Sequence, residues 1–370
     1  MAPDAQRHPQ IAHFGDIVCE LRRPGFRRPP PKVVNAADGI FAAFQAHPLV
    51  GLGEWHGLAQ ELDFYSVLVR DPRFARDIGN IVLEMGDASQ QSVVDRYVNA
   101  ENVPYRELRK VWSDTVGAYP TVQYLGTINL YAAIRAVNEK LPPESRIKVW
   151  LGDPPIDWSQ IKNSEALQTL MDQRNSYPVA LIEREILNKG KKALVIYGTA
   201  HFGAYPDGIF PGDPPSHREP NIRFLLDAKH AGALYVVHPY VGYTKTDCNE
   251  GFEKNLKGLF APSLLFPIRG SSMEEDVKRP DCTPVPKPPE ENQERWNAFI
   301  PSFNGEASDA FLYLGPRKPL TASSSVPDLY LDLDFRAEID RRARVRTGNG
   351  LNAIPDPVYN PASVQPYFPN

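Results

Sequence analysis

Carboxylates and histidines stand at or just after the ends of five short apolar runs in this sequence. They are Glu54 and His56, Glu84, Asp153, His201 and His238. A histidine positioned by a carboxylate can act as general base on water, while a second histidine or an arginine stabilises the developing oxyanion. Imidazole and carboxylate together also bind zinc, manganese or iron. The residue types therefore predict a hydrolytic site, with or without a divalent metal.

The apolar runs that would position these residues are typical of strands buried on both faces. They cover 48–53, 80–85, 147–152, 193–198, 233–238, 264–268 and 310–315. Segments with helical spacing lie between them, at about 58–69, 87–98, 120–140, 164–188 and 221–230. This alternation predicts an α/β fold, a single large domain with a mainly parallel sheet flanked by helices. Ligand crevices of such sheets lie at the carboxyl ends of the strands, so we expect the polar residues to meet there.

The first polar pair has a spacing that favours joint action. Glu54 and His56 are two residues apart, so an extended backbone would point both side chains the same way. Trp55 could line a substrate pocket or pack in the core. Glycines at positions 53, 152 and 198 are expected to allow tight or left-handed turns where the strands end.

Proline makes up 37 of the 370 residues, about twice the usual ~5%. The prolines concentrate in 24–31, 206–220, 280–289 and 355–369, which predicts loops and extended tails. We expect an N-terminal arm and first helix over 1–47 and an α/β domain over 48–320. That domain contains a Pro-rich excursion at about 270–294. A C-terminal extension over 321–370 is expected to pack on it, with a strand edge and a charged helix within 329–346.

The net charge and the absence of several known sequence motifs argue against some classes of function. The net charge of −4 argues against nucleic acid as the main partner and favours a small molecule or peptide. No apolar run reaches the ~18 to 20 residues of a transmembrane helix, and no GxSxG, GxxxxGK[ST] or GxGxxG motif occurs. Of the three cysteines, Cys19, Cys248 and Cys282, the last two could form a disulfide or remain thiols. The sequence is therefore compatible with an exported, periplasmic location after removal of a leader and with a cytoplasmic location.

Two groups of motifs resemble known families. The segments 53–57 (GEWHG) and 83–97 (LEM, then QQ and DRY) resemble the GExH and EM…Q…D-x-[YF] motifs of ChaN-like haem-binding uptake proteins. Arg174 and Asn175, followed by GTAH at 198–201, resemble the RN…GxxH arrangement of the Tiki and TraB proteins. These families share a broad superfamily with the erythromycin esterases, whose first motif carries one more residue between Glu and His. Its members include metalloproteases, esterases and haem or iron carriers, so the resemblance implies a fold and a site rather than one reaction.

The resemblance and the residue types together lead us to expect a hydrolase that cleaves an ester or amide bond through water. His56 would be general base or metal ligand, Glu54 and Glu84 would orient it or bind the metal, and His201 would be the second ligand or an acid. Arg174 would stabilise the oxyanion. Substrate contacts are expected from Trp55, Asp153, Asn175 and His238.

Two alternatives belong to other functional classes. The first is a haem- or iron-binding protein of the ChaN type, in which the same cluster is a ligand site or a structural element. The second is a degenerate superfamily member whose polar rim recognises a partner. Unlike the Tiki proteins the sequence has no transmembrane anchor, and unlike the ChaN-like proteins it has a long Pro-rich C-terminal third.

Overall fold

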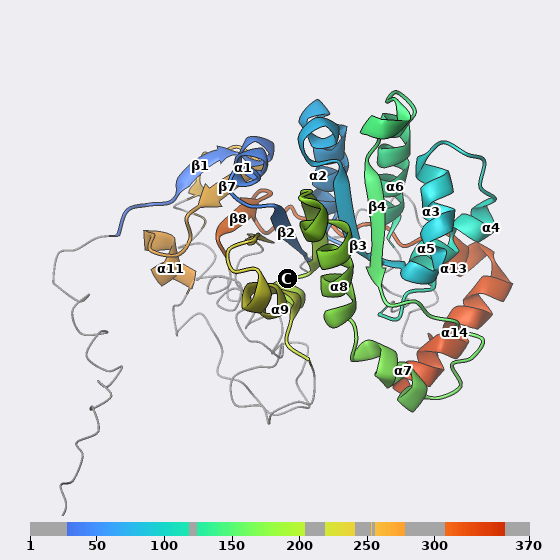
Figure 1. Cartoon of the computed structure of the whole chain (residues 1–370). Helices are drawn as coiled ribbons and strands as arrows, with labels where there is room; N and C mark the ends of the chain where they lie inside the picture. The colour runs from blue at the N-terminus through green and yellow to red at the C-terminus, as the bar shows by residue number, and fades with distance from the viewer. Residues whose placement is uncertain are drawn as a thin grey trace, which may run out of the picture.

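The computed structural model describes residues 28–117, 124–203, 219–240, 253, 256–277 and 308–351 (Figure 1). Within these ranges, eight strands form one sheet in the order β1-β7-β8-β6-β2-β5-β3-β4. The strands are β1 (Lys32–Asn35), β2 (Leu49–Glu54), β3 (Asn80–Asp87), β4 (Lys148–Asp153), β5 (Ala193–Gly198), β6 (Leu234–Pro239), β7 (Ser263–Phe266) and β8 (Ala310–Tyr313).

Seven of the strands coincide with the seven predicted apolar runs. The strand β7 is antiparallel to β1 and β8, whereas the other neighbouring pairs are parallel. The predicted α/β fold with a mainly parallel sheet is therefore confirmed. The strand β1 was not predicted. It forms the edge of the sheet by pairing with β7, where Val33 and Val34 lie opposite Leu265 and Leu264.

Helices separate the parallel strands and lie on both sides of the sheet (Figure 1). The α-helices are α1 (Ala36–Ala43), α2 (Ala59–Arg70), α3 (Gln91–Val98), α4 (Tyr105–Leu108), α5 (Lys110–Ser113), α6 (Leu125–Asn138), α7 (Ser164–Met171), α8 (Ser176–Glu185), α9 (Ile222–Lys229), α11 (Ser272–Val277), α13 (Asp328–Leu331) and α14 (Leu333–Thr347). Short 3-10 or π turns are η1 (Phe74–Ile78), η2 (Ala88–Gln90), η4 (Pro143–Ser145), η5 (Leu187–Lys189) and η6 (Thr199–Phe202).

Two predicted elements need correction. The single helix expected over 164–188 is two helices, α7 and α8, separated by a turn at 172–175. Pro178 gives the reason, because proline is tolerated only in the first turn of a helix and cannot continue one that began at Ser164. The segment 329–346 holds no strand edge. It forms α13 and α14, where the side chain of Asp332 caps α14 by accepting from the backbone N–H of Phe335.

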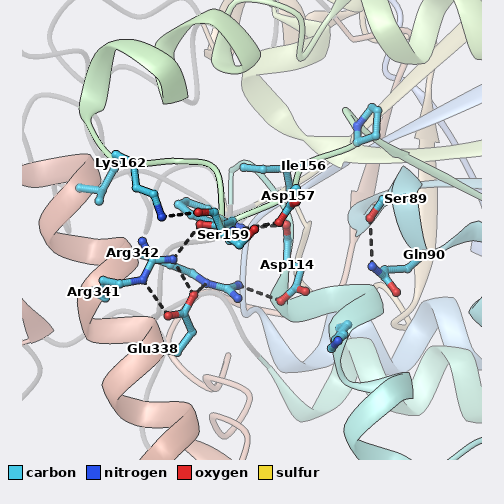
Figure 2. Close-up of a pocket in the computed structure, with 14 residues that line it drawn as sticks. Ser89, Gln90, Asp114, Ile156, Asp157, Ser159, Lys162, Glu338, Arg341 and Arg342 are labelled. Carbon is cyan, nitrogen blue, oxygen red and sulfur yellow. Dashed lines mark hydrogen bonds and ion pairs between the residues drawn. The ribbon is translucent and has the colours of Figure 1, made fainter.

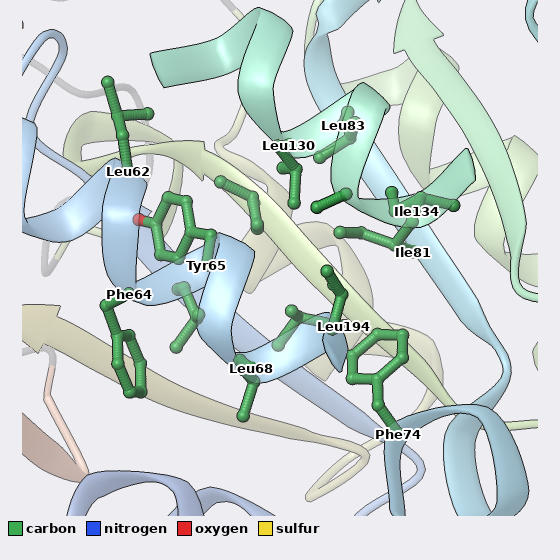
Figure 3. Packing of buried hydrophobic residues seen from close by; sticks show 14 of the residues in the cluster. Leu62, Phe64, Tyr65, Leu68, Phe74, Ile81, Leu83, Leu130, Ile134 and Leu194 are labelled. Atoms are coloured by element: carbon green, nitrogen blue, oxygen red, sulfur yellow. The ribbon is translucent and has the colours of Figure 1, made fainter. Parts of the chain in front are cut away.

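The strands alternate their side chains between two cores. On one face, Leu62, Tyr65 and Leu68 of α2 and side chains of α6 pack against apolar residues of β3 and β5 (Figure 3). On the other face, residues such as Ile182 of α8 and Leu226 of α9 cover the same strands. Both faces are therefore sealed, and the polar groups of the central strands have only the strand ends on which to gather.

The C-terminal helices pack at one end of the sheet. The helix α14 contacts α7 beyond the end of β4 (Figure 1), and it buries Phe335, Ile339 and Ala343 in a small cluster of its own. Across the described ranges, no helix is long and apolar enough to cross a bilayer. The three cysteines and most of the predicted Pro-rich loops lie outside the described residues.

Candidate functional site

Four parallel strands bring the predicted polar residues to one edge of the sheet. The register pairs Glu54 at the end of β2 with Gly198 at the end of β5, and Asp87 of β3 with Asp153 of β4. Arg174 and Asn175 reach the same edge from the turn between α7 and α8. We call this group the polar centre. Its members are Glu54, His56, Glu84, Asp153, Arg174, Asn175 and His201.

Glu84 is the hub of the polar centre. Its Oε1 accepts from the guanidinium of Arg174 and lies 3.2 Å from Nε2 of His201. Its Oε2 accepts from the backbone N–H of Gly198 at 2.6 Å and lies 4.0 Å from Nε2 of His56. Burial would raise the pKa of Glu84, but the positive charges of His201 and Arg174 outweigh it and hold the pKa well below its ordinary range. Glu84 is therefore a buried carboxylate.

Arg174 is fixed between two buried acids. Its Nη2 donates to Glu84 and its Nε donates to Oδ1 of Asp153 at 3.0 Å. Asp153 also accepts from the backbone N–H groups of Val116 and Gly117 through Oδ2. Burial raises the pKa of Asp153, and the adjacent Arg174 opposes that rise. Because both acids engage the guanidinium, Arg174 serves to hold the site together.

His201 is oriented by the side-chain amide of Asn175, which lies in the turn before α8. Its Nδ1 lies 2.6 Å from Oδ1 of Asn175, and its Nε2 faces Glu84. Both ring nitrogens thus face oxygen atoms of the centre, which fixes the orientation of the imidazole. The turn itself is secured by Glu219, whose Oε1 accepts from the backbone N–H groups of Asn175 and Ser176 at 2.5 and 2.8 Å.

His56 is the most accessible of these charged groups. Its side chain is 37% exposed, whereas those of Glu54 and Glu84 are 4% and 3% exposed. Its Nδ1 lies 3.5 Å from Oε1 of Glu54. Removal from water would lower the pKa of His56, but the hydrogen bond and charge of Glu54 and the charge of Glu84 raise it to about 9. A pKa in this range favours the protonated ring at neutral pH, so His56 could act as the predicted general base only after losing that proton.

Two predicted substrate contacts, His238 and Trp55, lie beside the polar centre but are packed into the protein. His238 is fully buried, and its Nδ1 and Nε2 lie 2.8 Å from Oγ of Ser308 and 3.4 Å from the carbonyl oxygen of Thr199. Burial lowers the pKa of His238 to about 3, so the ring is neutral. Trp55 is half-buried and packs against the main core. The structure thus supports a packing role for both residues.

One buried acid near the centre was missed by the sequence analysis. Glu61 is 1% exposed, and its oxygens accept from the backbone N–H of Trp55 at 2.9 Å and the hydroxyl of Tyr65 at 2.5 Å. It lies in the first turn of α2, where an acid is usually read as a favourable but ordinary helix residue. The available signal was its position within an otherwise apolar helix face, which makes it a brace for the turn that carries His56.

The strand-end glycines have a different role from the predicted one. Gly53, Gly152 and Gly198 do not have positive φ angles. Each instead leaves room for a side chain: at Gly198, a β-carbon would lie 2.9 Å from Nε2 of His56 and 3.4 Å from Oε2 of Glu84. The absence of a side chain at position 198 therefore lets His56 approach Glu84.

The geometry does not fit the predicted metal site formed by Glu54, His56, Glu84 and His201. Within the described part of the chain, there is no group of three or more His, Cys, Asp or Glu residues that could hold a metal ion. The reason is visible in Glu84, whose oxygens already accept from Arg174, His201 and Gly198. Fixed protein cations and N–H groups thus occupy the positions that a metal would need.

A cavity of about 1000 Å³ lies between α14 and the segment that follows β4 (Figure 2). Its lining is strongly charged, but Arg341 and Arg342 both contact Glu338 at 2.7 Å, and Arg342 also contacts Asp114 at 2.8 Å. These contacts tie α14 to α5. The wall near β3 includes Ser89, whose hydroxyl donates to Asp87. The cavity offers a polar binding space at the same edge of the sheet as the polar centre.

No protein-family model matches this chain, and no curated protein matches it. Solved structures that match this chain include the type III effector HopBA1, at 14% identity and a TM-score of 0.36, with 60% of this chain and 90% of that one covered. A Bacillus cereus protein matches at 13% identity and a TM-score of 0.46, covering 78% of this chain and 94% of that one. A structure described as bacterial protein toxins matches at 15% identity and a TM-score of 0.37, covering 56% and 36%. With TM-scores of 0.36, 0.46 and 0.37, these matches carry no conclusion about this chain.

Proposed function

We propose that the protein is a hydrolase that cleaves an ester or amide bond of a small molecule or peptide by activating water. The observation that carries the proposal is the position of His56. This ring is 37% exposed and faces two almost fully buried carboxylates, Glu54 at 3.5 Å and Glu84 at 4.0 Å. A solvent-facing acid backed by buried bases is the arrangement that proton transfer to a bound substrate requires.

The proton positions assign the roles. Glu54 would take a proton from the attacking water as the new carbon–oxygen bond forms, while the His56 cation stabilises the developing oxyanion. His56 would then donate its proton to the leaving oxygen or nitrogen as the scissile bond breaks. Glu54 then releases its proton to solvent as the products leave, and the exposed ring of His56 takes one from solvent, which restores the starting state. This sequence balances the protons and replaces the base role predicted for His56 by an acid role.

The remaining polar residues support this pair without taking part in bond cleavage. Glu84 holds His56 from the opposite side and is itself fixed by Arg174, His201 and Gly198. Such buried, fully bonded networks keep catalytic groups in one geometry. Membership in the superfamily of the ChaN-like, Tiki and erythromycin esterase proteins is part of the proposal, and it rests on the motif residues.

A panel of activated esters and short peptides tests the proposal. We expect Glu54→Gln and His56→Gln each to lower turnover by at least about 100-fold, the usual size of an acid or base contribution. His47→Gln is the control, because His47 bonds to the carbonyl oxygen of Gly232 away from the centre. Equal turnover in all four proteins would contradict the assignment.

The haem- or iron-binding alternative has a separate test. Hemin is titrated into the purified protein and the Soret band is followed, while the metal content is measured by mass spectrometry before and after chelation. A stoichiometric Soret band that His56→Gln and His201→Gln abolish would favour the carrier over the hydrolase. No band together with measurable ester or peptide cleavage would favour the hydrolase.

A further inference from the structure

We propose that Arg346 of α14 is a positioning residue for the polar centre and acts through the segment 113–117. The helix α14 lies at the end of the chain's described part and contributes no group to the centre itself. Its arginines nevertheless hold the backbone that presents two N–H groups to Asp153. The proposal extends the proposed function, since it names a device that keeps the site of that hydrolase in order.

The first link joins α14 to the segment 113–117. Nη1 of Arg346 donates to the carbonyl oxygen of Gly117 at 2.7 Å. One turn earlier, Nη1 of Arg342 donates to the carbonyl oxygen of Ser113 at 3.0 Å and to Asp114 at 2.8 Å. The segment is thus held at both ends by the same helix, and charge-assisted bonds of this kind are among the stronger hydrogen bonds in proteins.

The second link joins that segment to the polar centre. The backbone N–H groups of Val116 and Gly117 both donate to Oδ2 of Asp153. Gly117 also lies against the guanidinium of Arg174, so closely that a β-carbon at this position would collide with Nη2 and Cζ of Arg174. Displacement of Gly117 would therefore remove a donor from Asp153 and uncover Arg174 at the same time.

The third link explains why this matters for Glu84. Asp153 is 1% exposed, and an ionised carboxylate in such a place depends on the donors around it. Arg174 is shared between Asp153 and Glu84. Loosening of Asp153 would thus change how Arg174 holds Glu84, the residue that His56 and His201 face. Arg346 acts on Glu84 at a distance through four successive contacts, each made by named atoms.

Amide hydrogen exchange tests the link without any substrate. We expect Arg346→Ala to speed exchange at the Val116 and Gly117 amides by roughly 10-fold or more while the amides of α14 keep their protection. Arg346→Lys should restore part of the protection, because a lysine can still donate to the carbonyl oxygen of Gly117. Arg344→Ala is the matched control, since Arg344 is 57% exposed and pairs with Asp340 of its own helix. Unchanged protection of the Val116 and Gly117 amides in Arg346→Ala would overturn the proposal. If Arg346→Ala does not fold, Arg346→Gln is measured in its place.

A second readout separates this inference from the proposed function. Histidine NMR signals report the polar centre directly, and we expect those of His56 and His201 to shift in Arg346→Ala and to stay in place in Arg344→Ala. If they shift as expected while neither protein cleaves any substrate, the coupling holds and the hydrolase proposal fails. If they stay in place while cleavage by the wild type is confirmed, the hydrolase stands and the role of Arg346 is refuted.

Discussion

Nδ1 of His56 lies 3.5 Å from Oε1 of Glu54, two residues earlier at the end of β2. The carboxylate is 4% exposed and the imidazole 37% exposed, so the pair joins the interior to the solvent. Together with Glu84, this neighbour raises the pKa of His56 to about 9. The proposed chemistry and the pH dependence of stability both depend on this proton.

The raised pKa makes the stabilising effect of His56 pH-dependent. The ring gains its partners in the folded state, so its contribution is fully present below its ordinary pKa of 6.5 and is lost as the pH rises through about 9. We expect the unfolding free energies of wild type and His56→Gln to differ most at pH 6 and to converge by pH 9.5. Solvent screening of this partly exposed group keeps the difference small. Urea denaturation at several pH values measures the unfolding free energies of both proteins. A difference between them that does not change with pH would contradict the pKa shift.

Removal of the charge of Glu84 should have a larger effect on stability. Glu84→Gln leaves a buried guanidinium with one carboxylate in place of two, and breaking such a buried pair costs about 3 to 5 kcal/mol. The pKa of His56 should also fall, because Glu84 contributes to its rise. Urea denaturation and histidine NMR titration measure the two effects. Glu185→Gln is the control, since its partners Arg184 and Lys189 are largely exposed and the expected loss is within about 1 kcal/mol. Equal losses of unfolding free energy in both variants would show that the contacts of Glu84 contribute no more than exposed ion pairs do.

Much of the fold could be predicted from the sequence, because buried parallel strands read as continuous apolar runs. The prediction held for β2 through β8, whose apolar positions alternate between two covered faces. It missed β1, where only Val33 and Val34 are apolar and the strand depends on pairing with β7. An edge strand of this kind is specified by its partner, which lies more than 200 residues away in the sequence.

The sequence also located most of the polar centre, because the carboxyl ends of parallel strands share one edge of the sheet. It could not assign protons. Whether His56 is acid or base depends on the two carboxylates beside it, and whether Arg174 is free depends on Asp153 and Glu84. The contact between Glu54 and His56 follows from local spacing, but those of Glu84 with His56 and of Arg174 with both acids join residues from separate elements. Their distances follow from register and packing.

The space left by Gly198 gives a test of the His56 geometry. In Gly198→Ala, the new methyl group would lie 2.9 Å from Nε2 of His56, so the ring must move away from Glu84. We expect the pKa of His56 to fall from about 9 toward its ordinary value, as measured by NMR titration. Gly39→Ala is the control: its β-carbon would meet Leu264 at 2.6 Å in the core, so it should lower stability and leave the titration of His56 unchanged. The same titration in Gly198→Ala and wild type would refute the close approach.

Glu61 offers the sharpest test of the buried electrostatics. Burial raises the pKa of this carboxyl well above its ordinary value of 4.5, against the hydrogen bond from Tyr65. The folded state therefore keeps a proton that the unfolded chain releases above pH 4.5, and wild-type stability should fall by about 1.4 kcal/mol per pH unit from this group alone. Gln keeps the shape and cannot ionise, so Glu61→Gln should lack that slope.

The comparison is made by urea denaturation between pH 5 and 8. The unfolding free energy of Glu61→Gln minus that of wild type should rise steadily with pH until the pKa of Glu61 in the folded protein is reached. Asp63→Asn, on the exposed side of the same helix α2, should follow the wild type throughout. A flat difference for Glu61→Gln would mean that Glu61 is ionised in the folded protein. The two donors on its oxygens, the N–H of Trp55 and the hydroxyl of Tyr65, would then outweigh burial, and a second negative charge would stand beside Glu54.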